Sequence, residues 1–322
     1  MTTPIEKPKK WLSASSIETL EVCTWKYKCQ NVERVPQLPN AGSQRGTIAH
    51  AIFEILLDKR HQKHVDLILE KHSVESSKAI QRLLIKMMQK ESIYDTLNYD
   101  IMIEMLLVGL KPDFYGSNMG GVVSKPEHKF ELENENPEYK IRGFIDKFVT
   151  YPDGMIVIRD FKSSKAKFDS AHLKSNNQAL AYSLVGYKQL NAKDVKTQFM
   201  FLRFPKQPIQ EIHLTPDQLE GFEYYLAHLY SIIKDFNDET AKSNFAATSE
   251  KNSWLCQRGS WRCPYLKPFS YWALVDDKGV AIRSSLSKES LRCKDDQKVI
   301  EKKYEGCFYW NKKNEDSPKD EM

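Results

Sequence analysis

Apolar residues spaced three and four positions apart dominate the first third of the chain. Residues 47–71 place four apolar side chains, from Ile48 to Leu56, on one face, which predicts an amphipathic helix. Residues 75–110 repeat the pattern with leucines and methionines, and we interpret the methionines as core filling. An earlier helix is predicted to start at Ser15 or Ser16 as its cap, followed by a loop over residues 31–45. We therefore predict an N-terminal helical region over residues 1–125.

The pattern changes near residue 126, where apolar and charged residues begin to alternate. Three strands are predicted around residues 130–132, 141–149 and 155–158, and the turn at residues 152–154 joins the last two in a hairpin. Helix, strand, strand and helix follow at residues 170–190, 199–202, 209–214 and 216–236. We assign residues 126–240 to a core of strands and helices, and residues 241–322 to a basic, aromatic-rich segment with a charged tail.

Composition excludes several classes of protein. The chain has 322 residues, of which 41% are hydrophobic and 28% charged, as is typical of a globular protein. No apolar stretch approaches the roughly 18 residues of a membrane span, and residues 1–10 are polar and basic, so we expect neither a membrane segment nor a secretory signal. The glycine-rich phosphate-binding motifs are missing, which argues against an ATPase motor or a dinucleotide-dependent enzyme.

Positive charge and aromatic residues gather near the C-terminus. Residues 251–313 hold 14 lysines and arginines against 7 aspartates and glutamates, together with ten aromatic residues. Basic side chains neutralise phosphates, and aromatic faces stack on unpaired bases. We therefore expect this segment to bind a single strand more tightly than a blunt duplex, through Trp254, Arg258, Trp261, Arg262 and Trp310. The alternative is a small aromatic core under a solvated basic surface.

Two acids and a lysine stand at the ends of the predicted hairpin strands. Asp146 follows the second strand, and Asp160 and Lys162 end the third. Because strand side chains alternate, Asp160 and Lys162 point to the same face, and the hairpin brings Asp146 to the same edge. Two carboxylates form a site for a hard cation such as Mg²⁺ or Mn²⁺, and the lysine can orient an attacking water or offset charge on a phosphoryl oxygen. A surface salt bridge at a strand end is the alternative.

These residues resemble the core signature of the PD-(D/E)XK nuclease superfamily. The flanking motifs are similar to its RecB-like branch, which includes the CRISPR-associated RecB-like exonucleases. Residues 13–17 ahead of Cys23 resemble the opening helix, residues 46–50 resemble the G-x-x-x-H helix, and residues 178–182 match the Q-x-x-x-Y motif. The resemblance covers residues 11–270 with the motifs in the expected order.

The resemblance implies a restriction-endonuclease-like α/β fold, with a central mixed sheet flanked by helices. The implied metal ligands are His50, Asp146, Asp160 and the carbonyl of Phe161, around Mg²⁺ or Mn²⁺. Lys162 would position the attacking water, and Gln178 and Tyr182 would complete the catalytic set. Accessory acids could come from Glu54, Glu127 or Glu131.

The resemblance predicts a metal-dependent deoxyribonuclease, an exonuclease acting in DNA end processing, repair or recombination, encoded by a bacterium or phage. Its partner would be DNA, as single strands or duplex ends, in the cytoplasm or at the nucleoid. A non-catalytic scaffold that binds DNA or a protein partner, and a restriction-type endonuclease, are the alternatives. We disfavour the first because every expected catalytic position is filled, and the second because the His50 and Gln178 motifs belong to the end-processing branch.

Many members of that branch hold an iron–sulfur cluster bound by four cysteines. The cysteine spacing of this chain differs from the spacing in those members. Cys23, Cys256 and Cys263 are candidate ligands, but the closely spaced further cysteine is missing, so Cys293 or Cys307 would have to loop back. We expect that the cluster has been lost and that an aromatic core replaces it.

Overall fold

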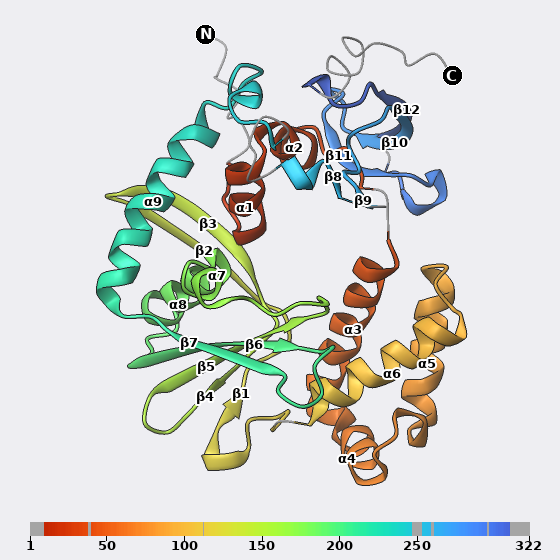
Figure 1. Ribbon diagram of the computed structural model, residues 1–322, viewed down its shortest axis with the longest axis vertical. Helices are drawn as coiled ribbons and strands as arrows, with labels where there is room; N and C mark the ends of the chain where they lie inside the picture. The colour runs from red at the N-terminus through yellow and green to blue at the C-terminus, as the bar shows by residue number, and fades with distance from the viewer. Residues whose placement is uncertain are drawn as a thin grey trace. The chain divides into compact units, whose positions relative to one another are not determined.

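The chain divides into two compact units (Figure 1). The computed structural model describes residues 10–37, 40–111, 113–246, 253–258, 261–294 and 296–309. One unit holds residues 1–14 and 39–230, and the other holds residues 15–38 and 231–322. This division groups the chain differently from the predicted segments 1–125, 126–240 and 241–322, because most of the helical region shares a core with the sheet.

Four main helices build the helical part of the first unit: α3 (Ala41–Leu57), α4 (Gln62–Lys71), α5 (Lys78–Lys90) and α6 (Thr96–Leu110). Helix α3 begins within the loop predicted over residues 31–45, because the Asn40 side chain accepts a hydrogen bond from the Ser43 amide at 2.9 Å and caps the helix. The single helix predicted over residues 47–71 is broken at Asp58, which has an extended backbone and accepts a bond from the Arg60 amide. The methionines of α5 and α6 do fill the core, as predicted.

Five strands of the first unit form a mixed sheet, as predicted, and their order is β1-β4-β5-β6-β7. They are β1 (Val122–Val123), β4 (Lys147–Thr150), β5 (Met155–Lys162), β6 (Asp194–Phe201) and β7 (Ile209–His213). Among these five strands only the β5–β6 pair is parallel, and α7 (Ser170–Lys174) and α8 (Asn177–Lys188) make the crossover between them. Helix α9 (Pro216–Lys234) follows β7.

A second ribbon, β2 (His128–Glu135) paired with β3 (Glu138–Ile145), precedes the central sheet. The strand predicted over residues 141–149 is therefore two strands, β3 and β4, and Asp146 lies at the break between them. Gly143 of β3 lies against the ring of Phe130, which a Cβ at this position would meet at 2.7 Å. Asp146 is thus placed where the chain passes from the ribbon into the central sheet.

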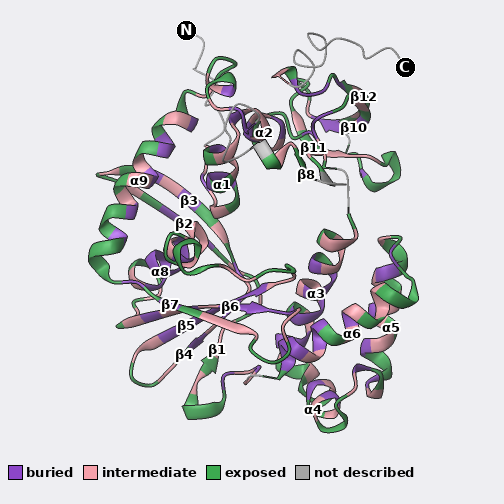
Figure 2. Ribbon diagram, in the orientation of Figure 1, coloured by how far each residue is buried: buried purple, intermediate pink, exposed green. Residues whose placement is uncertain are grey.

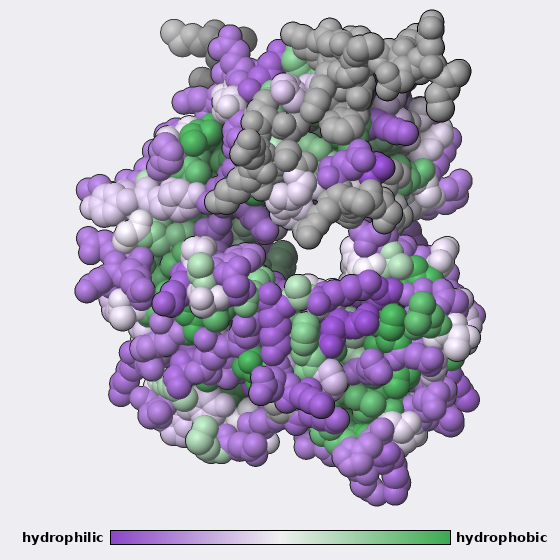
Figure 3. All heavy atoms as spheres, in the orientation of Figure 1, coloured by the Kyte–Doolittle hydropathy of each residue, from purple (hydrophilic) through white to green (hydrophobic). Residues whose placement is uncertain are grey.

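Alternation along β5 divides its side chains between two layers. Phe161 faces the helical core and packs with residues of α3, α5 and α6, while Asp160 and Lys162 point to the opposite face, on which α8 lies. Figure 2 shows the central strands β5 and β6 largely buried and α9 mostly exposed along its outer side. On the face drawn in Figure 3, apolar surface gathers over the helical region around α6, and hydrophilic side chains cover most of the other residues coloured by hydropathy.

The second unit contains most of α1 (Ala14–Val22), α2 (Thr24–Tyr27), the π-helical turn η1 (Lys28–Val32), and five short strands. These are β8 (Gln257–Arg258), β9 (Trp261–Arg262), β10 (Phe269–Val275), β11 (Ala281–Ser285) and β12 (Lys298–Tyr304). Helix α1 begins at Ala14, one residue before the predicted cap. Tyr265, Tyr271 and Tyr304 are buried around Cys29, so part of the aromatic segment is a core, as in the alternative interpretation. Within the described ranges, no helix combines the length and apolar character needed to cross a bilayer.

Gly109 of α6 is expected to be intolerant of a side chain. A Cβ there would lie 2.1 Å from the ring of Phe53, which is fully buried and stacks on Phe161 with ring centroids 4.3 Å apart. We expect Gly109→Ala to lower the free energy of unfolding by about 1–3 kcal/mol through overpacking, measured by urea denaturation. Gly221→Ala in α9 is the control, because a Cβ there would meet no described side chain or neighbouring element within 4 Å. Equal stabilities for the two variants would contradict this packing.

Candidate active site

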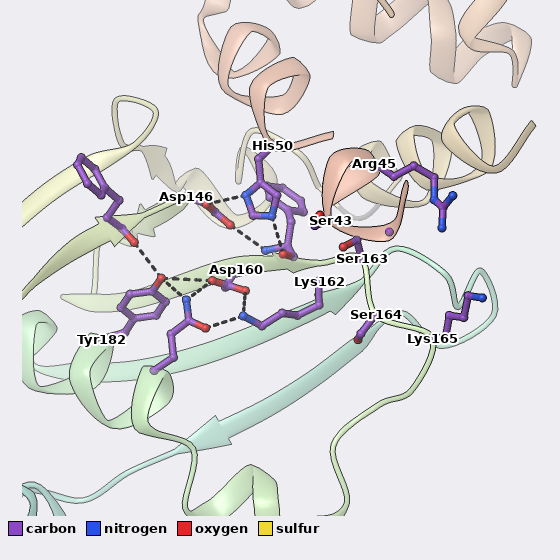
Figure 4. Close-up of a pocket in the computed structure, with 14 residues that line it drawn as sticks. Ser43, Arg45, His50, Asp146, Asp160, Lys162, Ser163, Ser164, Lys165 and Tyr182 are labelled. Carbon is purple, nitrogen blue, oxygen red and sulfur yellow. Dashed lines mark hydrogen bonds and ion pairs between the residues drawn. The ribbon is translucent and has the colours of Figure 1, made fainter. Parts of the chain in front are cut away.

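One cavity of about 570 Å³ in the first unit collects most of the side chains singled out in the sequence (Figure 4). His50 comes from α3, Asp146 from the break between β3 and β4, and Asp160 and Lys162 from β5, while Gln178 and Tyr182 come from α8. The side chain of Asn176 caps α8 by accepting from the amides of Gln178 and Ala179, so the face of that helix that lines the cavity starts at its first turn. Residues remote in sequence therefore face one space.

His50 is held by both of its ring nitrogens. Its Nδ1 lies 3.0 Å from Oδ1 of Asp146, and its Nε2 lies 2.8 Å from the carbonyl oxygen of Phe161. The other oxygen of Asp146 accepts a hydrogen bond from the Phe161 amide at 2.9 Å. The atoms proposed as ligands on His50, Asp146 and Phe161 are therefore already neighbours.

Asp160 and Lys162 are connected to α8. Nζ of Lys162 lies 2.7 Å from Oδ2 of Asp160 and donates to Oε1 of Gln178 at 2.5 Å. Nε2 of Gln178 donates to Oδ1 of Asp160 at 2.5 Å and to the Tyr182 hydroxyl at 2.6 Å. The Tyr182 hydroxyl donates to the carbonyl oxygen of Phe144 at 2.8 Å. Gln178 thus holds both the acid and the lysine, and the Tyr182 hydroxyl is occupied within the protein.

Burial and charge perturb the titration of this cluster. Burial disfavours the imidazolium, but the hydrogen bond and negative charge of Asp146 outweigh it and raise the pKa of His50 to about 9. Burial raises the pKa of Asp160, which is 3% exposed, and Asp146 adds to that effect while Lys162 opposes it. Burial also raises the pKa of Tyr182 well above its usual value, so this residue stays a neutral hydrogen-bond donor.

The residues present fit a hard divalent cation. In the part of the chain that the structure describes, no three histidine, cysteine, aspartate or glutamate side chains hold a metal ion as they stand, and His50 uses its nitrogens in hydrogen bonds. However, the buried Oδ2 of Asp160 makes no hydrogen bond to any described residue, although it is ion-paired with Lys162. Two carboxylates and one carbonyl oxygen are the donors that Mg²⁺ or Mn²⁺ prefers, and a neutral imidazole can add a nitrogen ligand to them.

The three candidate accessory acids lie in different places. Glu54 and Glu127 line a small second pocket together with His50 and Asp146. Burial and the charge of Glu127 raise the pKa of Glu54, which agrees with the two acids facing each other. Glu131 instead forms an ion pair with Lys129 at 2.6 Å and lines neither pocket, so its selection as a site acid is not supported.

The cavity also has lining residues that sequence analysis did not select. Ser163 and Ser164 directly follow Lys162, and Arg45 directly precedes the G-x-x-x-H helix motif. Their positions next to these motifs are the feature of the sequence that could have identified them as site residues. Figure 4 shows Arg45 and Lys165 at the side of the cavity away from Tyr182, with the serines nearer the middle. Burial and the positive charge of Arg203 lower the pKa of Arg45.

The residues predicted to bind single-stranded DNA belong to the second unit. Trp254 is 49% exposed, and Arg262 is also exposed. The side chains of Arg258 and Trp261 lie outside the described residues, as do Trp310 and the tail at residues 311–322. The proposed contact through Trp254 stays a prediction.

Four cysteines of the second unit line one apolar pocket: Cys23, Cys256, Cys263 and Cys307. Burial raises the pKa of the Cys263 thiol to about 11, although cluster ligation requires thiolates. Cys293 points elsewhere, and its Sγ donates to the Gln297 carbonyl at 2.8 Å.

The cysteine spacing predicts that the purified protein lacks a stoichiometric iron–sulfur cluster, because the closely spaced further cysteine is missing, although in the structure Cys307 lines the same pocket as Cys23, Cys256 and Cys263. The measurement is iron content and absorbance near 400 nm after anaerobic purification. About four irons per chain would contradict this expectation and would make Cys307, which shares the pocket, the fourth ligand. The Cys293→Ser variant is the matched control, since it should leave either result unchanged.

A mixed sheet whose hairpin carries two aspartates and a lysine, with a histidine supplied by a preceding helix, is the arrangement of a nuclease. The chain belongs to the PD-(D/E)XK nuclease superfamily, because the model of that family matches residues 11–267. The family assignment made from the motifs is thereby confirmed.

Three relatives from Streptococcus agalactiae are each named as a subunit of an ATP-dependent helicase/deoxyribonuclease. The serotype III protein is 26% identical over 221 residues, and the serotype Ia and V proteins are 25% identical. Each match covers 65% of this chain and 20% of the relative, so the chain spans about one fifth of these proteins. A solved structure of a candidate exonuclease from Eubacterium rectale superimposes with a TM-score of 0.46 and 11% identity, covering 81% of this chain and 96% of that one.

Proposed function

We propose that this protein is a magnesium- or manganese-dependent deoxyribonuclease, an exonuclease that hydrolyses phosphodiester bonds at DNA ends during repair or recombination. The observation that supports the proposal most directly is the chain of contacts Asp160–Lys162–Gln178–Tyr182 beside His50 and Asp146 in one cavity. The superfamily generally uses divalent metals, and the relatives' name contains deoxyribonuclease.

Each residue has a role in this proposal. His50, Asp146, Asp160 and the Phe161 carbonyl would hold the cation, which when bound would supply Lewis-acid stabilisation of the phosphoryl oxygen and activation of a water. His50 must lose its proton before Nε2 can bind a cation. Lys162 orients the attacking water and offsets the charge that builds on the phosphate.

Two further features support a nucleic-acid substrate. Gln178 fixes Lys162 and Asp160 relative to each other, so the lysine is positioned before the substrate binds. Arg45 and Lys165, at the other side of the cavity, can bind the neighbouring phosphates.

The test is a cleavage assay on end-labelled single-stranded and duplex DNA and on closed circular DNA, with magnesium, manganese or EDTA. We expect metal-dependent release of nucleotides from linear ends and no cutting of circles. Cutting of circles would favour a restriction-type endonuclease. Binding without cleavage under all conditions would favour a non-catalytic scaffold.

A further inference from the structure

Phe144 occupies an unusual position for a large apolar side chain. It lies near the end of β3, where the sequence predicted a strand, and it is 55% exposed. It also lines the same cavity as Asp160 and Lys162. Single exposed apolar residues are common on protein surfaces, but this one stands at the candidate active site.

The surroundings of Phe144 argue against an apolar docking patch. On this face of the β2–β3 ribbon the paired neighbours are charged: Lys129 opposite Phe144, Glu131 opposite Arg142, and Glu133 opposite Lys140. A protein partner that buried this face would have to desolvate all of these charges. A ligand that offers one flat apolar face beside negative charge fits better, and a nucleotide has this chemistry.

The backbone of Phe144 is fixed to the catalytic cluster. Its carbonyl oxygen accepts from the Tyr182 hydroxyl at 2.8 Å, and that hydroxyl lies 3.2 Å from Oδ1 of Asp160. One side chain therefore connects Phe144 to the proposed metal-binding carboxylate. Tyr182 itself is 4% exposed and cannot offer a ring face to a ligand, whereas Phe144 can.

We propose that the ring of Phe144 stacks on an unpaired base next to the phosphodiester held at Asp146 and Asp160, which makes the site selective for single-stranded or frayed DNA ends. This inference rests on the proposed nuclease function and deepens it. Inside a duplex both faces of a base are covered by its neighbours, so only an unpaired base can use the platform. From there the strand's phosphates would run toward Arg45 and Lys165, on the side of the cavity away from Tyr182 (Figure 4).

The test compares wild type with Phe144→Ala, Phe144→Trp and the control Tyr224→Ala. Tyr224 is 60% exposed on α9, belongs to the same unit and does not line the cavity. Binding of single-stranded and blunt duplex oligonucleotides is measured with calcium in place of magnesium. We expect Phe144→Ala to weaken single-strand binding by about 5- to 150-fold with little effect on duplex binding, and Phe144→Trp to retain the preference.

A second measurement separates stacking from a structural effect. Single abasic positions are placed one after another along the single strand, starting from its end. Wild type should lose affinity at one or two positions, and Phe144→Ala should show no loss there. An abasic profile that is the same for both proteins, or an equal loss of single-strand and duplex binding, would overturn the proposal.

Cleavage in magnesium is measured in parallel. A wild type that shows the abasic profile but cleaves no DNA would refute the proposed hydrolysis and leave the stacking platform standing. A wild type that cleaves DNA but binds equally well whichever position is abasic would refute the stacking platform and leave the proposed hydrolysis standing.

Discussion

Asp160→Asn is expected to lower kcat for DNA cleavage by at least about 1000-fold, because it removes a charged ligand from the proposed cation site. The substitution keeps the size of the side chain, and its amide oxygen can still accept from Gln178 and Tyr182. Folding should not suffer. Burial raises the pKa of Asp160, so the ionised form is costly in the folded state, and a neutral side chain removes that cost. We therefore expect a melting temperature close to that of wild type, because the loss of the ion pair with Lys162 offsets this gain.

The measurements are single-turnover cleavage with magnesium, and thermal unfolding followed by circular dichroism. Asp100→Asn, at an exposed position of α6, is the control and should change neither quantity. Wild-type cleavage by Asp160→Asn would show that this carboxylate is not a ligand in the reaction. A large fall in melting temperature would show instead that the charge of Asp160 stabilises the fold.

Lys162→Ala is expected to lower kcat by about 100- to 1000-fold while the affinity for metal changes little. Lys162 contributes a charge, not a ligand atom, and its side chain bridges Asp160 and Gln178. Its removal leaves Oε1 of Gln178 without this donor and Oδ2 of Asp160 without its ion pair. KM for DNA should rise less than kcat falls, because the effect is largest where charge builds on the phosphate.

The measurements are kcat and KM at saturating magnesium, and manganese affinity by electron paramagnetic resonance. Lys90→Ala, at the exposed end of α5, is the matched control. Arginine should not replace Lys162, because its planar guanidinium cannot reproduce a compact ammonium between two acceptors. Manganese affinity that falls in parallel with kcat would contradict the separation of roles between Lys162 and the carboxylates.

Much of the site could be predicted from spacing along the chain. The alternation of β5 places Asp160 and Lys162 on one face, and one helical turn places Gln178 beside Tyr182; both relations are present in the structure. The structure adds that Gln178 accepts a hydrogen bond from Lys162. The helical region, the hairpin and the mixed sheet were predicted as well.

Other features depended on packing between distant elements. The sequence predicted one strand over residues 141–149, but β3 pairs with β2 and β4 pairs with β5, and this divides the strand at Asp146. Phe144 alternates as an apolar strand residue, yet it is 55% exposed and lines the cavity. The sequence left open whether Cys293 or Cys307 would join Cys23, Cys256 and Cys263, and the structure places Cys307 in their pocket.

The sequence by itself determined which side chains of one strand or one helix act together, because the periods of 2 and 3.6 residues fix their directions locally. Only the tertiary structure decided how these pairs meet. His50 reaches Asp146 across 96 residues and the Phe161 carbonyl across 111, and no local period relates such positions. These contacts of His50 are set by the packing of α3 against β5. Phe53 of α3 stacks on Phe161 of β5, and this directs His50, on the same helix, to the carboxylates.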